Sequence, residues 1–585
     1  MRSRRAPHCT YARACPATLV TALIAVLASG AAQAQAVSPV TVTPPSLAPE
    51  HRDGGLRVEI PETGALQAPV GAEGLSITLG EVRVEGGFAE VAGQTDAVVQ
   101  ALRGRKVSLK DIYAAASRIE AIHARAGYVL ARVLVPPQDL RNGGALRLVV
   151  TDGFIESVDV SGLPARIRYA VRARAARLEG RRHVTLRQIE RALLIAGDAP
   201  GLTLRSTLMR GLQTGGTRVV LEGRQRLLSG SFGADNQIDP SLGRWGFNLQ
   251  LALNSALGLG EQIYGFSASD YDLTHAFNGS ARERVLGGGI ILPLGDGRFS
   301  LNPEVTFART LPEAAAGAPP TLGELHRLTL RASETLIRTR DLQAGLTLAI
   351  EQMDERNTIT LGNVAISHDR YMVLRPGAAW SLIRPGSASY GLSAQFSRGL
   401  SGLGAISSGD AAASGDAAAS GVPFSRQGTD NAFNKLSASA RAGWAMGRGL
   451  SLSLSARGQT SFGKAVFRAE QFALEGADGL SAYVGGRTAV DAGFALRTEL
   501  ARPVETGAGL MSGVTPYAFG AFGAGRLEDP TAVERAHISA FNLGAGLRAT
   551  LAERVTLSVE YARGLSDDAA LDNVNRINAS ATLRF

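Results

Sequence analysis

The residues that most often carry out catalysis or bind metals are scattered in this chain. None of its eight histidines lies at a spacing that would place two of them on one metal ion. The sequence has no phosphate-binding P-loop, no G-x-S-x-G nucleophile elbow, and no pair of carboxylates that stands out from the other charges. Because no such pattern is present, the sequence predicts a protein that is not an enzyme and that uses no metal and no cofactor.

The most concentrated charge is a run of nine arginines between residues 166 and 191. A run of this kind on a helix most often forms a solvated face. Two functional interpretations are the steering of an acidic client and contact with anionic lipid head groups. The formal charge of the whole chain is +9, and it falls to about +5 without the four arginines of the first 13 residues, which is too weak to indicate nucleic-acid binding. The nine arginines are Arg166, Arg168, Arg172, Arg174, Arg177, Arg181, Arg182, Arg187 and Arg191.

The N-terminus has the pattern of a secretory signal peptide, in which arginines precede an apolar run at 17–30 and small residues follow it. We predict a signal peptide over 1–34, cleaved before Gln35. The alternative is a membrane anchor, for which the run is shorter than the ~20 residues required. The only cysteines, Cys9 and Cys15, precede the apolar run, so the mature chain is expected to lack disulfides although it enters an oxidising compartment.

The last residues of the chain alternate between apolar and polar side chains. From Ile577 to Phe585 every second residue is apolar and those between are polar. A period of two describes a strand with one apolar and one polar face. A chain that ends in such a strand, on an aromatic residue, is typical of a bacterial outer-membrane β-barrel, with lipid on one side and a lumen on the other. We therefore predict an outer-membrane location and assign Phe585 as a C-terminal assembly signal.

Sixteen candidate strands follow one another over 227–585. Short turns alternate with long loops, which is typical of periplasmic turns and extracellular loops, and an even number returns both ends to the periplasm. No apolar stretch after residue 34 is long enough for a membrane helix. The longest predicted loops are 312–325, 356–370, 401–433, 462–493 and 566–575. The third contains a tandem Gly-Asp-Ala-Ala-Ala-Ser repeat, which is expected to form a solvent-exposed tip.

A linker and two mixed units are predicted before the barrel. Residues 35–74 are punctuated by Pro and Gly, as in a linker without a core. They are interpreted either as a flexible periplasmic leader or as a plug segment that enters the pore. The order β-α-α-β-β is predicted over 75–152 and again over 153–224. The expected fold class is therefore α+β for these two units, followed by an all-β, sixteen-stranded antiparallel transmembrane barrel over 227–585.

One segment of the first unit resembles a known family. Residues 127–140, GYVLARVLVPPQDL, are similar to a conserved run of the haemolysin activation/secretion (FhaC/ShlB-like) proteins, which are two-partner-secretion outer-membrane transporters. The resemblance extends over roughly 75–585. It implies that the units at 75–152 and 153–224 are periplasmic POTRA domains in front of the barrel.

The resemblance also implies a function. Such a transporter exports an unfolded partner protein, a haemolysin- or adhesin-like exoprotein, from the periplasm to the cell surface. A sheet edge could capture an extended client by adding a strand, since main-chain pairing needs little sequence specificity. The expected partners are this client, outer-membrane lipids and the machinery that inserts barrels, with no nucleic acid. The candidate client-binding residues are Val129, Leu130, Ala131, Arg132, Val133, Leu134 and Val135.

The predicted loop 462–493 lies between strands eleven and twelve, where the family has a loop that folds back into the lumen. Residues 474–486 resemble the motif of that loop, but Ser481 stands at the position of its arginine. The acidic partner of that arginine, on strand thirteen, is replaced by Gly523. The strand-thirteen motif of this chain is Phe522, Gly523 and Gly525.

The double replacement predicts that a different contact holds the loop to the barrel wall. Loss of one partner would leave a buried charge unpaired, whereas loss of both avoids that penalty. Arg487 is the candidate for the missing positive charge, paired with Glu499 or Glu560 on the polar phase of their strands. The predicted fold-back residues are Gly479, Leu480, Ser481, Ala482, Tyr483, Gly485, Gly486 and Arg487.

Two other functions share parts of this pattern. A barrel-assembly factor of the same superfamily has the same fold but typically carries more than two POTRA units. A passive porin would lack the β-α-α-β-β repeats.

Overall fold

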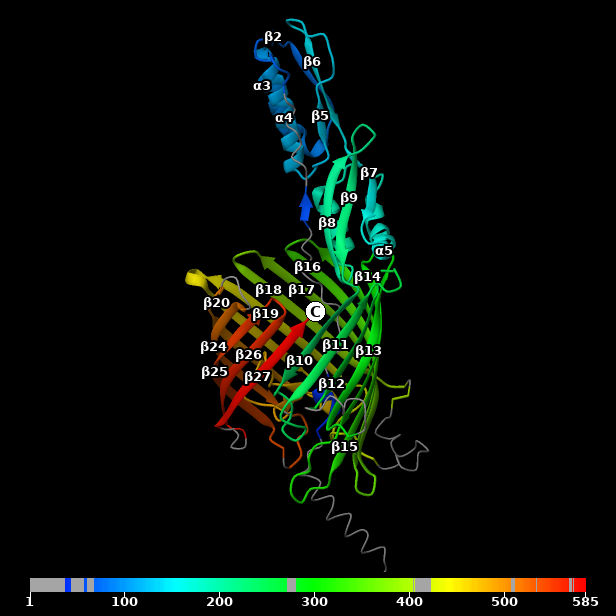
Figure 1. Cartoon of the computed structure of the whole chain (residues 1–585), viewed down its shortest axis with the longest axis vertical. Coiled ribbons are helices and arrows are strands. Elements are labelled where there is room, and N and C mark those ends of the chain that lie inside the picture. Colours follow the sequence, from blue (N-terminus) through cyan, green and yellow to red (C-terminus); the bar gives the residue numbers. More distant parts are fainter. Residues whose placement is uncertain are drawn as a thin grey trace, which may run out of the picture.

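A closed barrel forms the C-terminal part of the protein, and two α+β units stand in front of it (Figure 1). The structure is a computed structural model, and it describes residues 37–43, 57–59, 68–270, 280–402, 404–405, 422–484, 486–506, 511–532, 534–567, 571 and 573–585. The predicted signal peptide and the tandem repeat at 409–420 lie outside these ranges. Within them, no helix is long and apolar enough to cross a membrane.

The barrel has the sixteen antiparallel strands that the sequence predicts, and its last strand pairs with its first. The strands are β10 (Leu228–Asp235), β11 (Gly246–Asn254), β12 (Gln262–Ser269), β13 (Glu283–Leu294), β14 (Phe299–Thr310), β15 (Thr321–Arg338), β16 (Leu342–Ile359), β17 (Val364–Arg384), β18 (Ala388–Leu400), β19 (Asn434–Met446), β20 (Leu450–Thr460), β23 (Ala492–Ala501), β24 (Met511–Arg526), β25 (His537–Leu551), β26 (Val555–Ser566) and β27 (Val574–Arg584).

Alternation of polarity decides which face of each strand meets lipid. On β26, Val559 and Tyr561 are exposed on the outer wall, whereas Glu560 between them is buried in the lumen. Successive strand residues point to opposite sides, so apolar residues line the outside and polar residues the inside. Side chains that line the lumen must therefore be sought on the polar phase.

The predicted extracellular loops at 312–325 and 356–370 are wrong in extent. β15 begins at Thr321, and β16 and β17 leave only the turn 360–363 between them. In this region Glu355 pairs across the ladder with Asp369, and Arg356 with His368. Both faces of these strand ends carry polar residues, so the period-two signal disappears although the backbone ladder continues.

The first α+β unit is built on a three-stranded sheet with the order β3-β6-β5. Helices α3 and α4 pack on it through a core that includes Ile112, Ile119 and Leu148. Ser108 and Asp111 form a capping box that begins α4. The elements are β2 (Ser76–Thr78), β3 (Glu81–Gly86), η1 (Ala89–Val91), α3 (Ala92–Leu102), β4 (Lys106–Ser108), α4 (Leu109–Arg125), β5 (Arg132–Leu134) and β6 (Ala145–Thr151).

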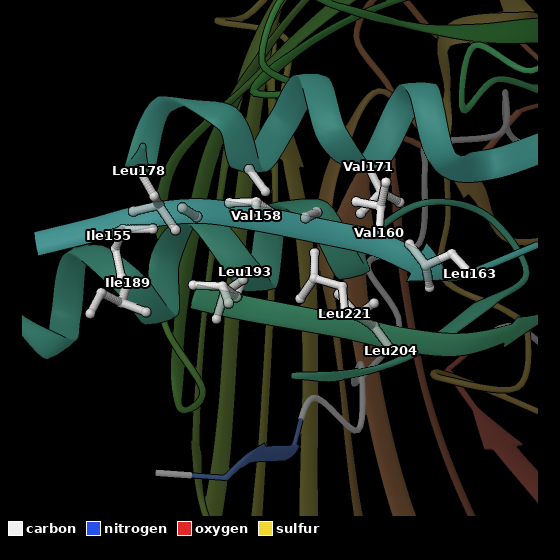
Figure 2. Close-up of a cluster of buried hydrophobic side chains, with 14 of the residues drawn as sticks. Ile155, Val158, Val160, Leu163, Val171, Leu178, Ile189, Leu193, Leu204 and Leu221 are labelled. Atoms are coloured by element: carbon white, nitrogen blue, oxygen red, sulfur yellow. The ribbon is translucent and has the colours of Figure 1, made fainter. Parts of the chain in front are cut away.

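The second unit repeats this plan. Figure 2 shows Val171 on one helix and Leu193 on the other, in one buried cluster with Val158 on a strand. Thr185 caps its last helix through the backbone N–H of Gln188. The elements are β7 (Phe154–Gly162), α5 (Ala165–Ala175), η2 (Ala176–Leu178), α6 (Leu186–Gly197), β8 (Leu202–Arg210) and β9 (Gly216–Gln225).

The second unit is fastened to the periplasmic turns of the barrel by charged groups. Arg338, at the end of β15, forms two hydrogen bonds with the carboxylate of Asp198 at 2.7 and 2.9 Å. Arg177 pairs with Asp296 of the β13–β14 turn, and Arg191 donates to the carbonyl oxygen of Leu336 at 2.7 Å. A solvated face is therefore the wrong interpretation for this part of the arginine run.

Candidate functional site

The loop 461–491, which joins β20 to β23, enters the barrel and carries a two-residue hairpin of β21 (Phe472–Ala473) and β22 (Ala489–Val490). Its tip is enclosed, with Leu480 at 0%, Ala482 at 1% and Tyr483 at 3% exposure. The tip packs in one apolar cluster with Tyr517, Phe519 and Ala562 from the inner wall. The tip residues thus contact lumen-facing side chains of β24 and β26.

Ser481 makes the polar contacts of the tip. Its Oγ accepts a hydrogen bond from Nη1 of Arg497 on β23 at 3.1 Å, and its carbonyl oxygen accepts one from Nδ2 of Asn578 on β27 at 2.9 Å. Arg497 also pairs with Glu560 at 2.6 Å. The positive charge at the tip therefore comes from the barrel wall, and the loop contributes a hydroxyl.

The predicted pairing of Arg487 is wrong. Arg487 lies on the exposed side of the returning limb, and both candidate carboxylates belong to other arginines. Glu560 pairs with Arg497, and Glu499 accepts from Nη2 of Arg548 at 2.8 Å. Arg497 could have been found from the sequence, because it lies two residues before Glu499 and hence on the same polar phase.

Glycines on the inner wall make room for the loop. A Cβ added to Gly523 would lie 3.1 Å from Cδ1 of Leu480, and one added to Gly525 would lie 2.5 Å from Cγ2 of Val490. Gly564 on β26 receives the ring of Tyr483 in the same way. The glycine of the strand-thirteen motif therefore lets apolar loop side chains lie directly on the strand, while Phe522 faces outward and is exposed.

Within the loop, the two limbs are held together by close backbone packing at Gly479 and by the carboxylate of Glu475. A Cβ on Gly479 would lie 2.5 Å from the carbonyl oxygen of Leu474, so only glycine fits there. Glu475 accepts from the backbone N–H of Gly486 and from Oγ1 of Thr488 at 2.9 Å. The structure does not describe Gly485.

The root of the loop is held by a second network, on a different part of the barrel wall from the part that the tip contacts. Glu470, in the one-turn helix η6 (Arg468–Glu470), is 1% exposed. Its carboxylate accepts from Arg375 on β17 at 2.6 Å, from Lys435 on β19 at 2.6 Å and from the hydroxyl of Tyr371 at 3.0 Å. A loop fixed to β17 and β19 at its root and to β23–β27 at its tip must cross the lumen. Sequence reasoning did not identify Glu470, which belongs to no recognised motif.

Residues 37–43 also lie in the lumen and include the one-turn helix α2 (Pro39–Val42) (Figure 1). Oγ of Ser38 donates to Oε1 of Glu355 at 2.7 Å, and Oγ1 of Thr310 donates to the carbonyl oxygen of Val37 at 2.7 Å. The flexible-leader interpretation is therefore wrong for these residues, which occupy the place expected of a plug.

This N-terminal segment and the fold-back loop contact each other. Val40 and Val42 pack on a cluster that includes Phe467 and Val466 of the loop root. A Cβ on Gly486 would lie 3.3 Å from Cγ2 of Thr41. The two elements that occupy the lumen are thus packed on one another, so movement of either exposes surface of the other.

The candidate client-binding run is only partly accessible. The predicted strand 129–135 shortens to β5, which is an edge strand of its sheet. Leu130, Ala131 and Val133 are buried, because they complete the cores under that edge, whereas Leu134 is exposed. Val129, Arg132 and Val135 are half-buried.

A side chain already covers the edge of β5. Its outward N–H, on Val133, donates to Oε2 of Glu120 on α4 at 3.2 Å. Arg132 lies 3.5 Å from the other oxygen of the same carboxylate. A client strand that paired with β5 would therefore have to displace Glu120.

The edge of the second sheet is occupied by the protein itself. The strand β1 (Arg57–Glu59) pairs in parallel with β8, from Arg57 opposite Arg205 to Glu59 opposite Thr207. This segment follows the lumen segment in sequence. Strand addition to these units is therefore possible, because the chain itself makes one such pairing.

The C-terminal aromatic closes the barrel. Phe585 exchanges two backbone hydrogen bonds with Gly230, at 3.0 and 3.1 Å, beyond the end of the β10–β27 ladder. Its side chain is exposed on the outer wall. Its role as an assembly signal stays a prediction.

Comparison with known proteins assigns this architecture to a family. Residues 215–566 match the haemolysin secretion/activation protein family ShlB/FhaC/HecB, and residues 77–153 match the ShlB-type POTRA domain. The chain belongs to this family. The chain is an outer-membrane protein with two-partner-secretion relatives, and its POTRA domains face the periplasm.

The relatives are distant in sequence and similar in fold. An outer membrane transporter CdiB of Escherichia coli is 26% identical over 296 residues, which are 49% of this chain and 47% of the relative. The solved CdiB from Escherichia coli has a TM-score of 0.67 at 21% identity and covers 97% of both chains. CdiB from Acinetobacter baumannii has a TM-score of 0.59 at 15% identity, with 97% of this chain and 98% of that one covered. At these identities, the solved structures establish the fold alone.

Proposed function

We propose that this protein exports an unfolded partner protein from the periplasm to the cell surface through its barrel. The observation that carries the proposal is a barrel whose lumen is crossed by parts of its own chain, each held by a separable set of contacts. A pore of this kind opens when those parts move. A barrel of sixteen strands is wide enough for an extended chain once its contents are displaced.

The POTRA sheets supply the place of capture. β5 and β8 are the edges at which strand addition is possible, and both are covered, by Glu120 and by β1 respectively. A client gains main-chain hydrogen bonds when it replaces either cover. Since β1 and the lumen segment belong to one N-terminal stretch, capture at β8 would act on that stretch directly.

The energy for export comes from the client. The sequence contains no nucleotide-binding motif. Folding of the client outside the cell makes its return unfavourable and so draws the chain outward. The protein acts as a transporter and not as an enzyme, and its own insertion depends on the barrel-assembly machinery.

Removal of residues 75–152 tests the proposal. The deletion takes only Leu130 and the adjoining Val129 from the core cluster of the second POTRA domain and nothing from the barrel, so the deleted protein should remain heat-modifiable in the outer membrane. Secretion of a partner encoded beside it should fall below detection, measured by immunoblot of the culture supernatant. Secretion at the level of the intact protein would contradict the docking role.

The same strains separate the alternatives. In cells without the protein, a barrel-assembly factor predicts lower amounts of other outer-membrane barrels, measured by quantitative proteomics. A porin predicts slower entry of small solutes. The exporter predicts neither effect, and predicts the loss of one exoprotein from the surface.

A further inference from the structure

Helix α5 of the second POTRA domain lies along the periplasmic rim of the barrel. Its residue Ala170 lies against Gly260 in the β11–β12 turn, and Nη2 of Arg174 donates to the carbonyl oxygen of Gly260 at 3.3 Å. One turn further, Arg177 pairs with Asp296 in the β13–β14 turn. Because the two turns belong to neighbouring hairpins, the helix runs parallel to the rim. Figure 1 shows it at the outer edge, above β14.

The rim beneath α5 marks the edge of the hydrocarbon layer. Leu294 and Phe299, which face each other across the β13–β14 turn, are about half exposed on the outer wall. Leu257 and Leu259, in the β11–β12 turn, are exposed as well. Apolar side chains on this face end where the head groups begin, and the head-group layer is roughly 5 Å or more thick on each side. A helix in contact with these turns lies at that level.

The exposed side of α5 has the chemistry of a head-group contact. Arg166, Tyr169 and Ala173 follow one another at helical spacing on the side opposite the core, with Arg172 beside them, and Tyr169 is 70% exposed. Arg166 and Arg172 have no hydrogen-bond or ion-pair partner in the described part of the chain, whereas Arg168 donates to the carbonyl oxygens of Leu163 and Ser161. α5 contains no acidic residue. Tyrosine and arginine at this depth are typical of the membrane interface.

Positive charge accumulates further along the same side. Burial, and then the neighbouring Arg298, Arg181 and Arg191, lower the pKa of Arg177. Several guanidinium groups therefore lie close to one another at the rim, with Asp296 as the acidic partner of Arg177 and Glu334 as that of Arg298. An anion that approached this surface from the bilayer would relieve their mutual repulsion.

We propose that the outer face of α5, formed by Arg166, Tyr169 and Arg172, binds the phosphate groups of anionic phospholipids in the periplasmic leaflet. Guanidinium groups bind phosphate in a bidentate manner, and the tyrosine ring sits between hydrocarbon and water. This surface adjoins lipid-facing leucines and lies away from the β5 and β8 edges, which favours lipid over an acidic client. The contact would fix the POTRA domain above the membrane and keep it aligned with the lumen.

The test uses the full chain in nanodiscs of phosphatidylcholine and phosphatidylglycerol. After delipidation in detergent, native mass spectrometry measures the ratio of the two lipids that stays bound. Each arginine near an anionic surface contributes roughly a fivefold preference. The double variant Arg166→Glu/Arg172→Glu removes two such arginines and should therefore lower the ratio by roughly 25-fold. Arg105→Glu/Arg118→Glu, with the same charge change on exposed residues of the first POTRA domain, is the matched control and should leave the ratio unchanged.

A second measurement places the surface. Both cysteines, Cys9 and Cys15, lie in the predicted signal peptide, so after its cleavage Ala173→Cys accepts a single nitroxide. The electron paramagnetic resonance spectrum of this nitroxide should be broadened more by nickel on a lipid head group than by a soluble nickel chelate. A nitroxide at Ala114→Cys on α4 should show the reverse. Should charge reversal impair assembly, Arg166→Gln/Arg172→Gln replaces it.

An unchanged lipid ratio in the arginine variants would overturn the proposal. So would equal broadening at the two labelled positions. An unchanged ratio together with reduced secretion would assign the surface to an acidic polypeptide instead.

Discussion

The two ends of the fold-back loop are held to the barrel by different kinds of contact. At the root, the Glu470 carboxylate is enclosed by Arg375, Lys435 and the hydroxyl of Tyr371. At the tip, apolar side chains lie on glycines of the wall. The loop's polar groups there, the hydroxyl and the carbonyl oxygen of Ser481, are neutral. The root contributes a buried charge to its contacts, whereas beside the tip Asp478 contributes an exposed one, to Arg441 on β19.

This difference predicts the order in which the loop moves. A buried carboxylate that leaves its cations costs several kcal/mol, because Glu470 and Lys435 would remain unpaired in a poorly hydrated site, while Arg375 would keep only Glu351 as an acidic partner. An apolar tip that leaves a glycine surface loses buried area and the hydrogen bonds of Ser481 with Arg497, Asn542 and Asn578. Because Arg497 stays paired with Glu560, this is a smaller loss. We therefore expect the tip to detach first while the root acts as the hinge.

The largest effect is expected from Glu470→Ala. It leaves Arg375 and Lys435 buried without their shared partner, at a cost of about 3–5 kcal/mol. The loop should lose its hinge, and pore conductance in planar bilayers should rise. Glu470→Gln, which keeps the shape, is the companion variant. Conductance equal to the unsubstituted protein in both variants would contradict the anchoring role of the root.

Arg497→Ala is expected to have the next largest effect, at about 3 kcal/mol, because it leaves Glu560 with neutral partners. Its readout is labelling of Ala482→Cys by a bulky impermeant maleimide on intact cells, slow in the parent and faster in the variant. Arg487→Ala is the matched control and should label at the parent rate, since that side chain is exposed. Equal rates for both arginine variants would show that the tip is not held by Arg497.

Gly523→Leu should push the loop away from strand thirteen, because the new side chain needs the volume that Leu480 and Leu474 occupy. Overpacking of this kind costs about 1–3 kcal/mol. Labelling at position 482 should accelerate while the barrel stays heat-modifiable. Gly520→Leu, on the same strand and without loop contacts, is the control. A labelling rate in Gly523→Leu equal to that of the parent would contradict the inference that Gly523 makes room for the loop.

Ser481→Ala should have the smallest effect. It removes the hydrogen bonds of the hydroxyl with Arg497 and Asn542 and keeps the backbone bond to Asn578. The expected loss is about 1–2 kcal/mol. A Ser481→Ala effect on labelling as large as that of Arg497→Ala would mean that the hydroxyl, and not the wall ion pair, dominates the tip.

Local sequence patterns predicted most of the architecture. The alternation that ends at Phe585 predicts the closing strand, and the same period predicts sixteen strands. It failed at the far ends of β15–β17, where Glu355 and Arg356 make both faces polar. The run of arginines predicts a charged helix, but not that Arg177 docks on Asp296, since docking depends on a turn more than a hundred residues away in the chain.

The candidate site was predicted in place but not in detail. The glycines at 523 and 525 and the serine at 481 pointed to a lock without its usual charge pair. The replacement was sought six residues along the loop, at Arg487, although the wall supplies it through Arg497. The physical reason is that a loop tip inside a barrel meets every inward-facing residue at its depth, and sequence distance from the tip says nothing about depth.

The type of each segment is encoded locally, because a period of two or of 3.6 fixes which face is apolar, and that pattern selects strand or helix and lumen or lipid. Which segments meet depends on how the whole chain folds. Glu470 pairs with Arg375 across 95 positions, and Ser38 bonds to Glu355 across 317. Such pairs form because closing sixteen strands into one ring brings opposite walls within reach of a single loop, and the depth at which side chains meet is set by strand register and not by any local pattern.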